Sequence, residues 1–540
     1  MDELGPRCRK LYQSIFESLD GDVSGRLASQ SYLDSSTAVY HGEVITMGFI
    51  PQIYSTQELC YFKRITDTTY GILEAITERF CVDAEYRKLF RFSPLLEYLI
   101  LLPTGYECTI PIARIDIFCD LESGDFKFCE FNTDGSSAMN EDREICNALA
   151  LSNTFQTASE ALRSTEGLNL YPQELFDPWV EEFGRIYEDF ARKTPCAPKP
   201  TDPVIAIVDY MDKTTIHELR EFRERFVRQG YRCLICDMSS LSYHDEVLYG
   251  VDVDPTHPYH QTPLRIDAIY RRAVTSDIME DLVAPGTRDT VTPGFLVDVK
   301  HAKGAIALIA AARDRSVCLI GGFKTQVAHS KTSFRMLHHP MTLAFLTDEQ
   351  RSFIKDHVPF TTDLIPEAVE ACGAADNKDA FIIKPVDGYG TKGVYAGQNH
   401  SATQWQQLLV DSSAKGYVLQ EYCHQYTAPN TRPVPFDAHG NPLFSTLEDA
   451  ARLTDESSFE PKALIPYNVL TGLFAYGGRF TGVYMRAGTD ALIVGFRGGV
   501  ALGAFIAHDA GGRIDNQTET SATHNFAIID DNLEIRLRRL

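Results

Sequence analysis

The sequence predicts a mixed α/β protein of two or three domains, and three observations lead to this fold class. The chain has 540 residues, more than a single hydrophobic core usually organises. From about residue 200 to 325, short apolar runs typical of buried strands alternate with amphipathic helical segments. A proline-rich break at 194–203 separates this region from a mainly helical one. We therefore expect three parts with these bounds: 1–200, 201–325 and 326–540.

The first part combines helices with one β-hairpin. To about Ile100, apolar residues recur at three- and four-residue spacing, which is typical of helices and indicates a scaffold. Two alternating apolar runs within 110–135 flank Glu122–Asp125, a good turn sequence, and this pattern predicts a hairpin. Helical patterns resume near Asn140 and continue through 182–191.

The second part predicts a small parallel sheet. A buried-strand run at 204–210, an amphipathic helix ending at Gly230 and a strand at 231–238 form a βαβ unit. Two more strands and a connecting helix extend this layer, and they are expected at 266–272, 317–322 and 300–314.

The third part is rich in β-strand patterns separated by glycine turns, which is typical of an antiparallel sheet over a ligand. The segments that carry these patterns are 381–397, 417–423, 467–488 and 491–507.

Charge and composition exclude several classes of protein. Lys and Arg number 51 against 74 Asp and Glu, and the net charge of -23 opposes binding to nucleic acid and to anionic membranes. No apolar run reaches the roughly 18 residues that a membrane span needs, and the first residues do not resemble a signal peptide. The 13 cysteines lack the spacing of a disulfide scaffold. We expect a cytoplasmic protein with reduced thiols.

The predicted hairpin carries a first candidate site. Arg114 and Asp116 stand two apart on one strand, and Glu130 and Asn132 stand two apart on the next. Alternation places each pair on one face, where Asp116, Glu130 and Asn132 converge. Two carboxylates and an amide oxygen are ligands that Mg²⁺ prefers, and an Arg beside them suits a phosphoryl group or a carboxylate. The alternative is the polar solvent face of an ordinary hairpin.

A second candidate site follows the strand that Lys384 closes. The next residues hold Gly388, Gly390 and Gly393, and such a loop lets backbone N–H groups approach phosphate oxygens while Lys384 and Lys392 supply charge. The loop matches neither a Walker loop nor a dinucleotide fingerprint, so an ordinary glycine hairpin is the alternative.

A third candidate ends another apolar strand, at Gln420, Glu421 and Tyr422. The backbone there could hydrogen-bond an adenine edge while Glu421 binds the ribose hydroxyls. An acid that merely ends a strand explains the pattern equally well.

Together these motifs resemble the glutathionylspermidine synthase type of ATP-grasp ligase, a family of circularly permuted order in which the metal-binding hairpin precedes the ATP-binding lysines. The resemblance runs from about residue 37 to the C-terminus. It rests on these residues, in chain order: Arg114 and Asp116, Glu130 to Asp134, Lys331, Lys384 with Pro385 and the glycine loop, Gln420 with Glu421, and Arg486.

The resemblance implies a fold and a set of roles. It implies an ATP-grasp fold whose first part carries the metal-binding hairpin, whose second is a small pre-ATP-grasp-like α/β domain and whose third binds ATP. Asp116, Glu130 and Asn132 would hold Mg²⁺. The ATP contacts would come from Lys331 and Lys384 to the phosphates, from Gly388 to Gly393 with Lys392 as their cover, and from Gln420 to Tyr422 on the adenine side. Arg114, Lys384 and Arg486 would act in catalysis.

These expectations together predict a ligase that uses ATP to join a carboxylate to an amine through an acyl phosphate and releases ADP and phosphate. The expected substrates are small molecules, with an amino acid or peptide as the carboxylate. The sequence departs from the family after the hairpin, at Asp134–Ser137, and in the loop 387–393. The family's nucleotide-binding and metal-binding roles therefore apply to this chain better than its substrates, glutathione and spermidine. Two alternatives stay open: an ATP-grasp kinase, and a non-catalytic ATP-binding module that regulates a partner.

Overall fold

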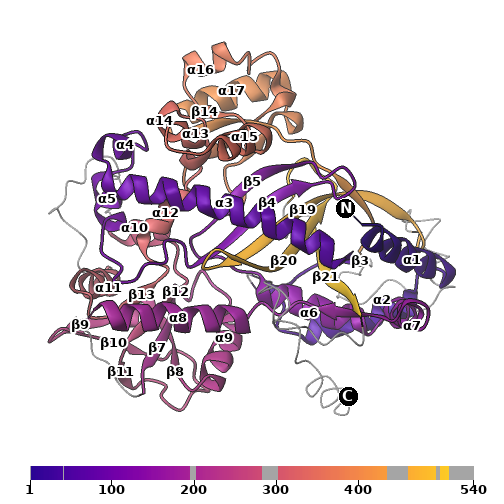
Figure 1. Ribbon diagram of the computed structural model, residues 1–540, viewed down its shortest axis with the longest axis horizontal. Coiled ribbons are helices and arrows are strands. Elements are labelled where there is room, and N and C mark those ends of the chain that lie inside the picture. The colour runs from indigo at the N-terminus through magenta and orange to yellow at the C-terminus, as the bar shows by residue number, and fades with distance from the viewer. Residues whose placement is uncertain are drawn as a thin grey trace.

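The computed structural model describes residues 2–40, 42–194, 202–282, 302–388, 390–433, 460–493 and 499–509. Its described part holds one large sheet, a parallel sheet and a small antiparallel lobe (Figure 1). The mixed α/β fold class is therefore confirmed. Within these ranges no helix is long and apolar enough to cross a bilayer.

The large sheet has eight strands drawn from both ends of the chain. Its order is β3-β21-β20-β19-β4-β5, with β18 beside β19 and β6 beside β21. Only β3 and β21 pair in parallel within it. Its strands are β3 (Met47–Tyr54), β4 (Ile112–Cys119), β5 (Phe126–Asn132), β6 (Leu168–Pro172), β18 (Thr427–Thr431), β19 (Leu464–Tyr476), β20 (Arg479–Gly488) and β21 (Gly499–Asp509). Residues 494–498 of the expected segment 491–507 lie outside the described residues.

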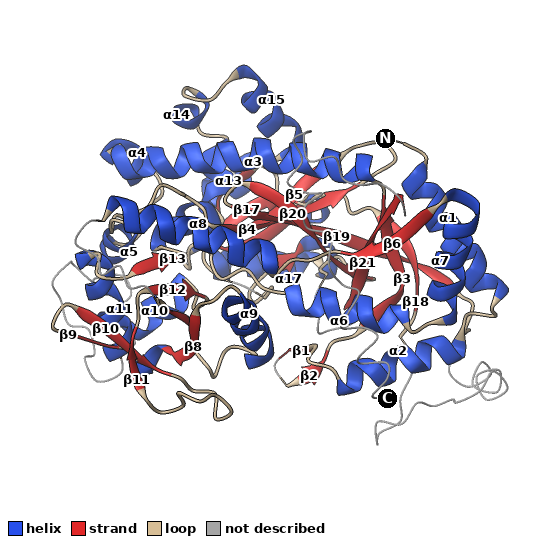
Figure 2. Cartoon of the chain, turned by 60° about the horizontal axis from the view of Figure 1, so that its bottom comes forward, coloured by secondary structure: helices blue, strands red, loops and turns tan. Residues whose placement is uncertain are grey.

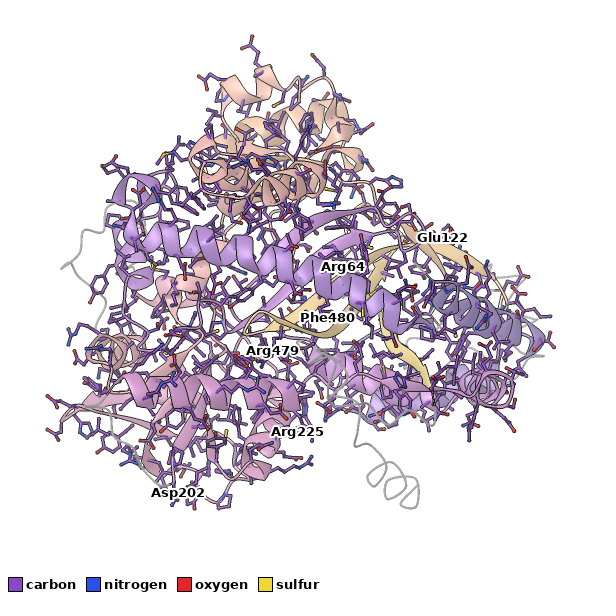
Figure 3. All side chains as sticks on the ribbon, in the orientation of Figure 1. Arg64, Glu122, Asp202, Arg225, Arg479 and Phe480 are labelled. Carbon is purple, nitrogen blue, oxygen red and sulfur yellow. The ribbon has the colours of Figure 1, made fainter. Side chains whose placement is uncertain are left out.

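Helices cover both faces of this sheet, as Figure 2 shows. The long helix α3 (Thr56–Val82) lies across one face, where the Phe62 ring is 6.3 Å from that of Phe480 on β20 (Figure 3). The other face packs against α6 (Met139–Ala150), whose Ile145 and Leu149 share a core with Phe505. Beside it lie α1 (Leu4–Ser18), α2 (Val23–Ser35), α7 (Asn153–Glu166) and the two-stranded β1 (Val39–Tyr40) and β2 (Glu43–Val44).

The parallel sheet has the order β13-β12-β7-β8, and its strands come from the segment where the sequence predicts them. They are β7 (Val204–Asp209), β8 (Arg232–Asp237), β12 (Ala268–Arg271) and β13 (Cys318–Ile320). The helices that flank it are α8 (Asp177–Lys193), α9 (Ile216–Arg228), α10 (Thr275–Leu282) and α11 (Lys303–Asp314), with a three-stranded sheet of β9 (Ser242–His244), β10 (Val247–Val251) and β11 (Pro263–Arg265).

The small lobe is an antiparallel sheet of order β14-β17-β15-β16. Its elements are β14 (Thr361–Asp363), β15 (Phe381–Pro385), β16 (Tyr395–Ala396), β17 (Tyr417–Glu421), α16 (Pro366–Ala371) and α17 (Ala402–Ser413). Buried Trp405 of α17 packs under β15 and β17. The remaining helices are α4 (Ala84–Lys88), α5 (Pro94–Ile100), α12 (Gln326–His329), α13 (Thr332–Leu337), α14 (Pro340–Leu343) and α15 (Asp348–His357).

Candidate active site

The hairpin of β4 and β5 brings its four polar side chains together as predicted. Asp116 is the cross-strand partner of Glu130, and Arg114 is the partner of Asn132. Their neighbours Ile115 and Phe131 point to the opposite face, into the core under α3.

A β-bulge makes this arrangement possible. Strict alternation would put Phe128 on the same face as Glu130, yet Phe128 and Phe131 share the core under α3. The pairing register shifts between Asp116 and Ile117, which leaves Cys129 as the extra residue on β5. The bulge therefore lets the apolar and the polar residues of one strand reach opposite faces.

Asp116 is fully buried and is held by two arginines. Arg114 Nε and Nη2 donate to its two oxygens at 2.8 and 3.1 Å, and Arg486 of β20 donates to Oδ2. Asn132 Nδ2 also donates to Oδ2, at 3.1 Å. The interpretation of this face as a polar solvent surface is thus wrong for Asp116, because its carboxylate is buried in an ion-pair network.

Gly472 leaves room for the pair of Arg114 and Asp116. The residue lies on β19 directly opposite Asp116, between β4 and β20. A Cβ at this position would lie 2.8 Å from Asp116 Oδ1 and from Arg114 Cδ. A larger side chain would therefore displace the ion-pair network.

Glu130 is the carboxylate that faces open space. It lines two pockets, and the described residues place no cation within 4 Å of its oxygens. Burial raises the pKa of Glu130, but the charges of Lys331, Arg486, Lys384 and Arg114 outweigh this and hold it at about 2. The side chain is therefore an anion at neutral pH.

Two predicted lysines lie together at one end of the first pocket. Lys331 Nζ donates to Gly388 O at 2.9 Å, and Lys384 Nζ donates to Cys129 O, the bulge carbonyl, at 3.1 Å. Burial lowers the pKa of Lys331, with Glu130 opposing this shift. Neither ammonium forms an ion pair in the described part of the chain, so both charges are available to an anion.

The rest of the first pocket comes from the other predicted residues. Gly388, Gly390 and Gly393 have φ values of 146°, 65° and 73°, a conformation that glycine adopts readily. Gly388 and Lys392 line the pocket beside the lysines. Residue 389 lies outside the described residues.

The strand end at Gln420 to Tyr422 lines this pocket as well. The Gln420 amide is buried and donates to Thr361 Oγ1 at 2.9 Å, so its side chain supports the strand. The Glu421 and Tyr422 N–H groups donate to Phe360 O and Ala380 O. These backbone N–H groups are therefore already paired.

A second pocket adjoins the first. Its volume is about 290 Å³, against about 80 Å³ for the first, and the two share Glu130 and Arg486. Arg114, Asn132 and Gly390 also line the second pocket. Of the predicted metal ligands, Glu130 lies at the junction and Asn132 lines the second pocket, whereas Asp116 is buried and lines neither pocket.

The far wall of the second pocket comes from residues that the sequence analysis does not identify. They belong to α6, to the ends of β7 and β12 with the segments that follow them, and to the starts of α9 and α10. These residues are Glu141, Asp209, Lys213, Thr215, Glu218, Arg272 and Asp277. The chain runs from β7 to β8 on one side and places β12 on the other, so the strand order reverses between β7 and β12. Ligands of open α/β sheets bind at such a point, a signal that only the sheet order reveals.

Comparison with known proteins finds similarity among solved structures. No family model matches the sequence, and no curated protein matches it. Among solved structures, the chain is similar to a glutathione synthetase-like effector from Globodera pallida in its apo form, at 12% identity over 90% of this chain and 96% of that one, with a TM-score of 0.47.

Two further solved structures are similar. One is a putative gamma-glutamylcysteine synthetase from Methylobacillus flagellatus, at 11% identity over 84% of this chain and 89% of that one, with a TM-score of 0.31. The other is D-alanyl-alanine synthetase A from Vibrio cholerae, at 11% identity over 51% of this chain and 86% of that one, with a TM-score of 0.23. These three TM-scores are below 0.5, so the function of the protein is argued from the residues of its own site.

Proposed function

We propose that this protein is an ATP-dependent ligase of ATP-grasp type that joins a carboxylate to an amine. The observation that carries this proposal is the meeting of two pockets at Glu130 and Arg486. The first pocket presents a glycine loop and two lysines that form no ion pair with a described residue, and these groups suit a triphosphate. The second has room for an amino acid beside the phosphate end. A module that only binds ATP needs no second pocket, whereas a kinase would use one for its acceptor, and the isotope experiment below separates the kinase from the ligase.

The residues at the junction of the two pockets supply part of the oxygen ligand shell that Mg²⁺ needs. Glu130 offers an ionised carboxylate that no cation contacts, and Asn132 adds an amide oxygen. Asp116 is held by Arg114 and Arg486, so its service as a ligand requires Arg486 to move away. We therefore propose Glu130 and Asn132 as magnesium ligands, with Asp116 as the third. When bound, the ion would neutralise charge on the phosphates.

The reaction follows from these positions. A carboxylate oxygen of the substrate attacks the γ-phosphorus of ATP, the bond to the β–γ bridging oxygen breaks, and ADP leaves. Lys331 and Lys384 stabilise the charge that moves onto the phosphates, and Arg486 lies at the junction to hold the transferred group. The amine then attacks the acyl carbon, loses a proton and expels phosphate.

An isotope experiment tests this order of bonds. A carboxylate labelled with heavy oxygen must pass one labelled atom to the released phosphate, because the attacking oxygen stays on phosphorus. The substrates come from a screen of carboxylate and amine pairs for magnesium-dependent ADP release and for a product lighter by one water than its parts. We expect labelled phosphate in mass spectrometry. Label in AMP indicates adenylation, and a phosphorylated product without an amide indicates a kinase; either result contradicts the ligase.

Replacing Lys384 tests the phosphate site. We expect Lys384→Ala to weaken ATP binding by about tenfold or more, because a charge-assisted contact to the phosphates is lost. The shift in melting temperature with Mg-ATP, compared with protein alone, measures this. Lys415→Ala is a matched control, since it removes a charge from the same lobe at an exposed site outside both pockets. An undiminished ATP-induced shift in Lys384→Ala would make this lysine structural only.

A further inference from the structure

The second pocket carries an imbalance of charge. Each of its Lys and Arg side chains has a carboxylate partner in the described structure. Arg272 pairs with Glu218 at 2.9 Å and Lys213 pairs with Asp277 at 2.7 Å. Arg114 and Arg486 are both taken by Asp116. The Lys and Arg side chains of this pocket therefore already have carboxylate partners, and Arg114 and Arg486 share one.

Besides Glu130 at the junction and the exposed Glu43, the pocket holds two acids without an ion-pair partner among the described residues, Asp209 and Glu141. Asp209 is 8% exposed and accepts hydrogen bonds from the Tyr210 N–H at 2.8 Å and from the Thr214 hydroxyl. Glu141, in the first turn of α6, has one buried oxygen, Oε2, without a hydrogen-bond partner. Neither carboxyl forms an ion pair with a described residue. The pocket thus lacks positive charge at these two positions.

The pKa values of Asp209 and Glu141 agree with a lack of positive charge beside them. Burial raises the pKa of Asp209 to about 6, and burial together with Glu218 raises that of Glu141 to about 8. Arg272 opposes both shifts without cancelling them. The raised pKa values mean that ionising these carboxyls costs free energy. A cation that enters the pocket would reduce this cost, because it would favour the ionised carboxylates.

A metal ion is a poor candidate for that cation. Within the described ranges, no group of three His, Cys, Asp or Glu side chains is placed to hold one. The pocket is also partly apolar, since Val44, Ile45 and Val274 line it. Carboxylates beside aliphatic side chains suit an organic cation with a short alkyl portion.

We propose that Asp209 and Glu141 form the subsite for the amine substrate, which enters as a protonated primary ammonium on a short alkyl group and passes one proton to a carboxylate of this pair before its nitrogen attacks. This inference rests on the proposed function and adds the residues that select the amine. Asp209 holds the ammonium from the end of β7, at the point where the order of the parallel sheet reverses. The pocket leads from there to Glu130 and Arg486, where the acyl phosphate would form.

Measuring the binding of a small ammonium ion tests the subsite directly and requires no turnover. The probes are propylammonium and n-propanol, which have similar size but differ in charge, and calorimetry measures both without ATP. We expect wild-type protein to prefer propylammonium, and Asp209→Asn to weaken that binding by about tenfold or more, because a charged hydrogen-bond partner is lost. Glu141→Gln should act in the same direction. Asp212→Asn, an exposed acid three residues from the end of β7, should bind as wild type does.

The melting temperature of the variants shows whether Asp209 binds the ammonium or instead supports the fold. A carboxyl that supports the fold would lower the melting temperature when replaced, whereas Asp209→Asn should keep or raise it, because it removes an uncompensated buried charge. Wild-type protein that does not distinguish the two probes, or Asp209→Asn that binds propylammonium as wild type does, overturns the subsite. If the ammonium preference holds but no magnesium-dependent ADP release occurs with any pair of substrates, the ligase function fails and the subsite stands.

Discussion

Glu130→Gln is expected to lower magnesium-dependent ATP turnover by about a thousandfold while the protein stays folded. Glu130 is an anion at the junction of both pockets, where it would hold Mg²⁺ between the phosphates and the protein. Glutamine keeps the size of the side chain and removes the charge that a divalent ion needs. No described cation lies within 4 Å of the carboxylate, so we expect the melting temperature to fall by no more than about 5 °C.

Steady-state ADP release at saturating magnesium measures the effect. Glu122→Gln is the matched control, because Glu122 is an exposed acid at the tip of the same hairpin (Figure 3). It should retain wild-type turnover. Near-normal turnover in Glu130→Gln would remove Glu130 from the metal site.

Asp116→Asn is expected to destabilise the protein by about 3–5 kcal/mol, as the loss of one partner from a buried ion pair does. Arg114 and Arg486 would keep their charges next to a neutral amide, in a place where water does not reach Asp116. The sequence alone suggests that this variant folds normally, and the buried network changes that expectation.

Differential scanning calorimetry measures this loss, and we expect a melting temperature lower by several degrees. The double variant Asp116→Asn with Arg486→Gln should recover part of it, since one uncompensated charge is gone. An unchanged melting temperature in Asp116→Asn would mean that the two arginines do not depend on this carboxylate. A loss of turnover without a loss of stability would instead favour a purely metal-binding Asp116.

The sequence determined the local features of the site. Alternation over the strands predicts that Arg114 and Asp116 share a face, and the turn at Glu122–Asp125 predicts that β5 returns beside β4. An apolar run ending in Lys384 predicts a lysine at a strand end next to a glycine loop. The alternating strands and helices of 201–325 likewise predict the parallel sheet. Each of these signals depends on residues close together in the chain.

Only the tertiary structure decided how these features combine. The bulge at Cys129 follows from the need to bury Phe128 and Phe131 together, and it supplies the carbonyl that Lys384 contacts. Arg486 reaches Asp116 across 370 residues of sequence, and Gly472 on the strand between them leaves room for Asp116 and Arg114. Asp209 and Glu141 meet one pocket because the order of the parallel sheet reverses beside α6. Periodicity describes one element at a time, whereas burial and charge pairing depend on which distant elements pack together.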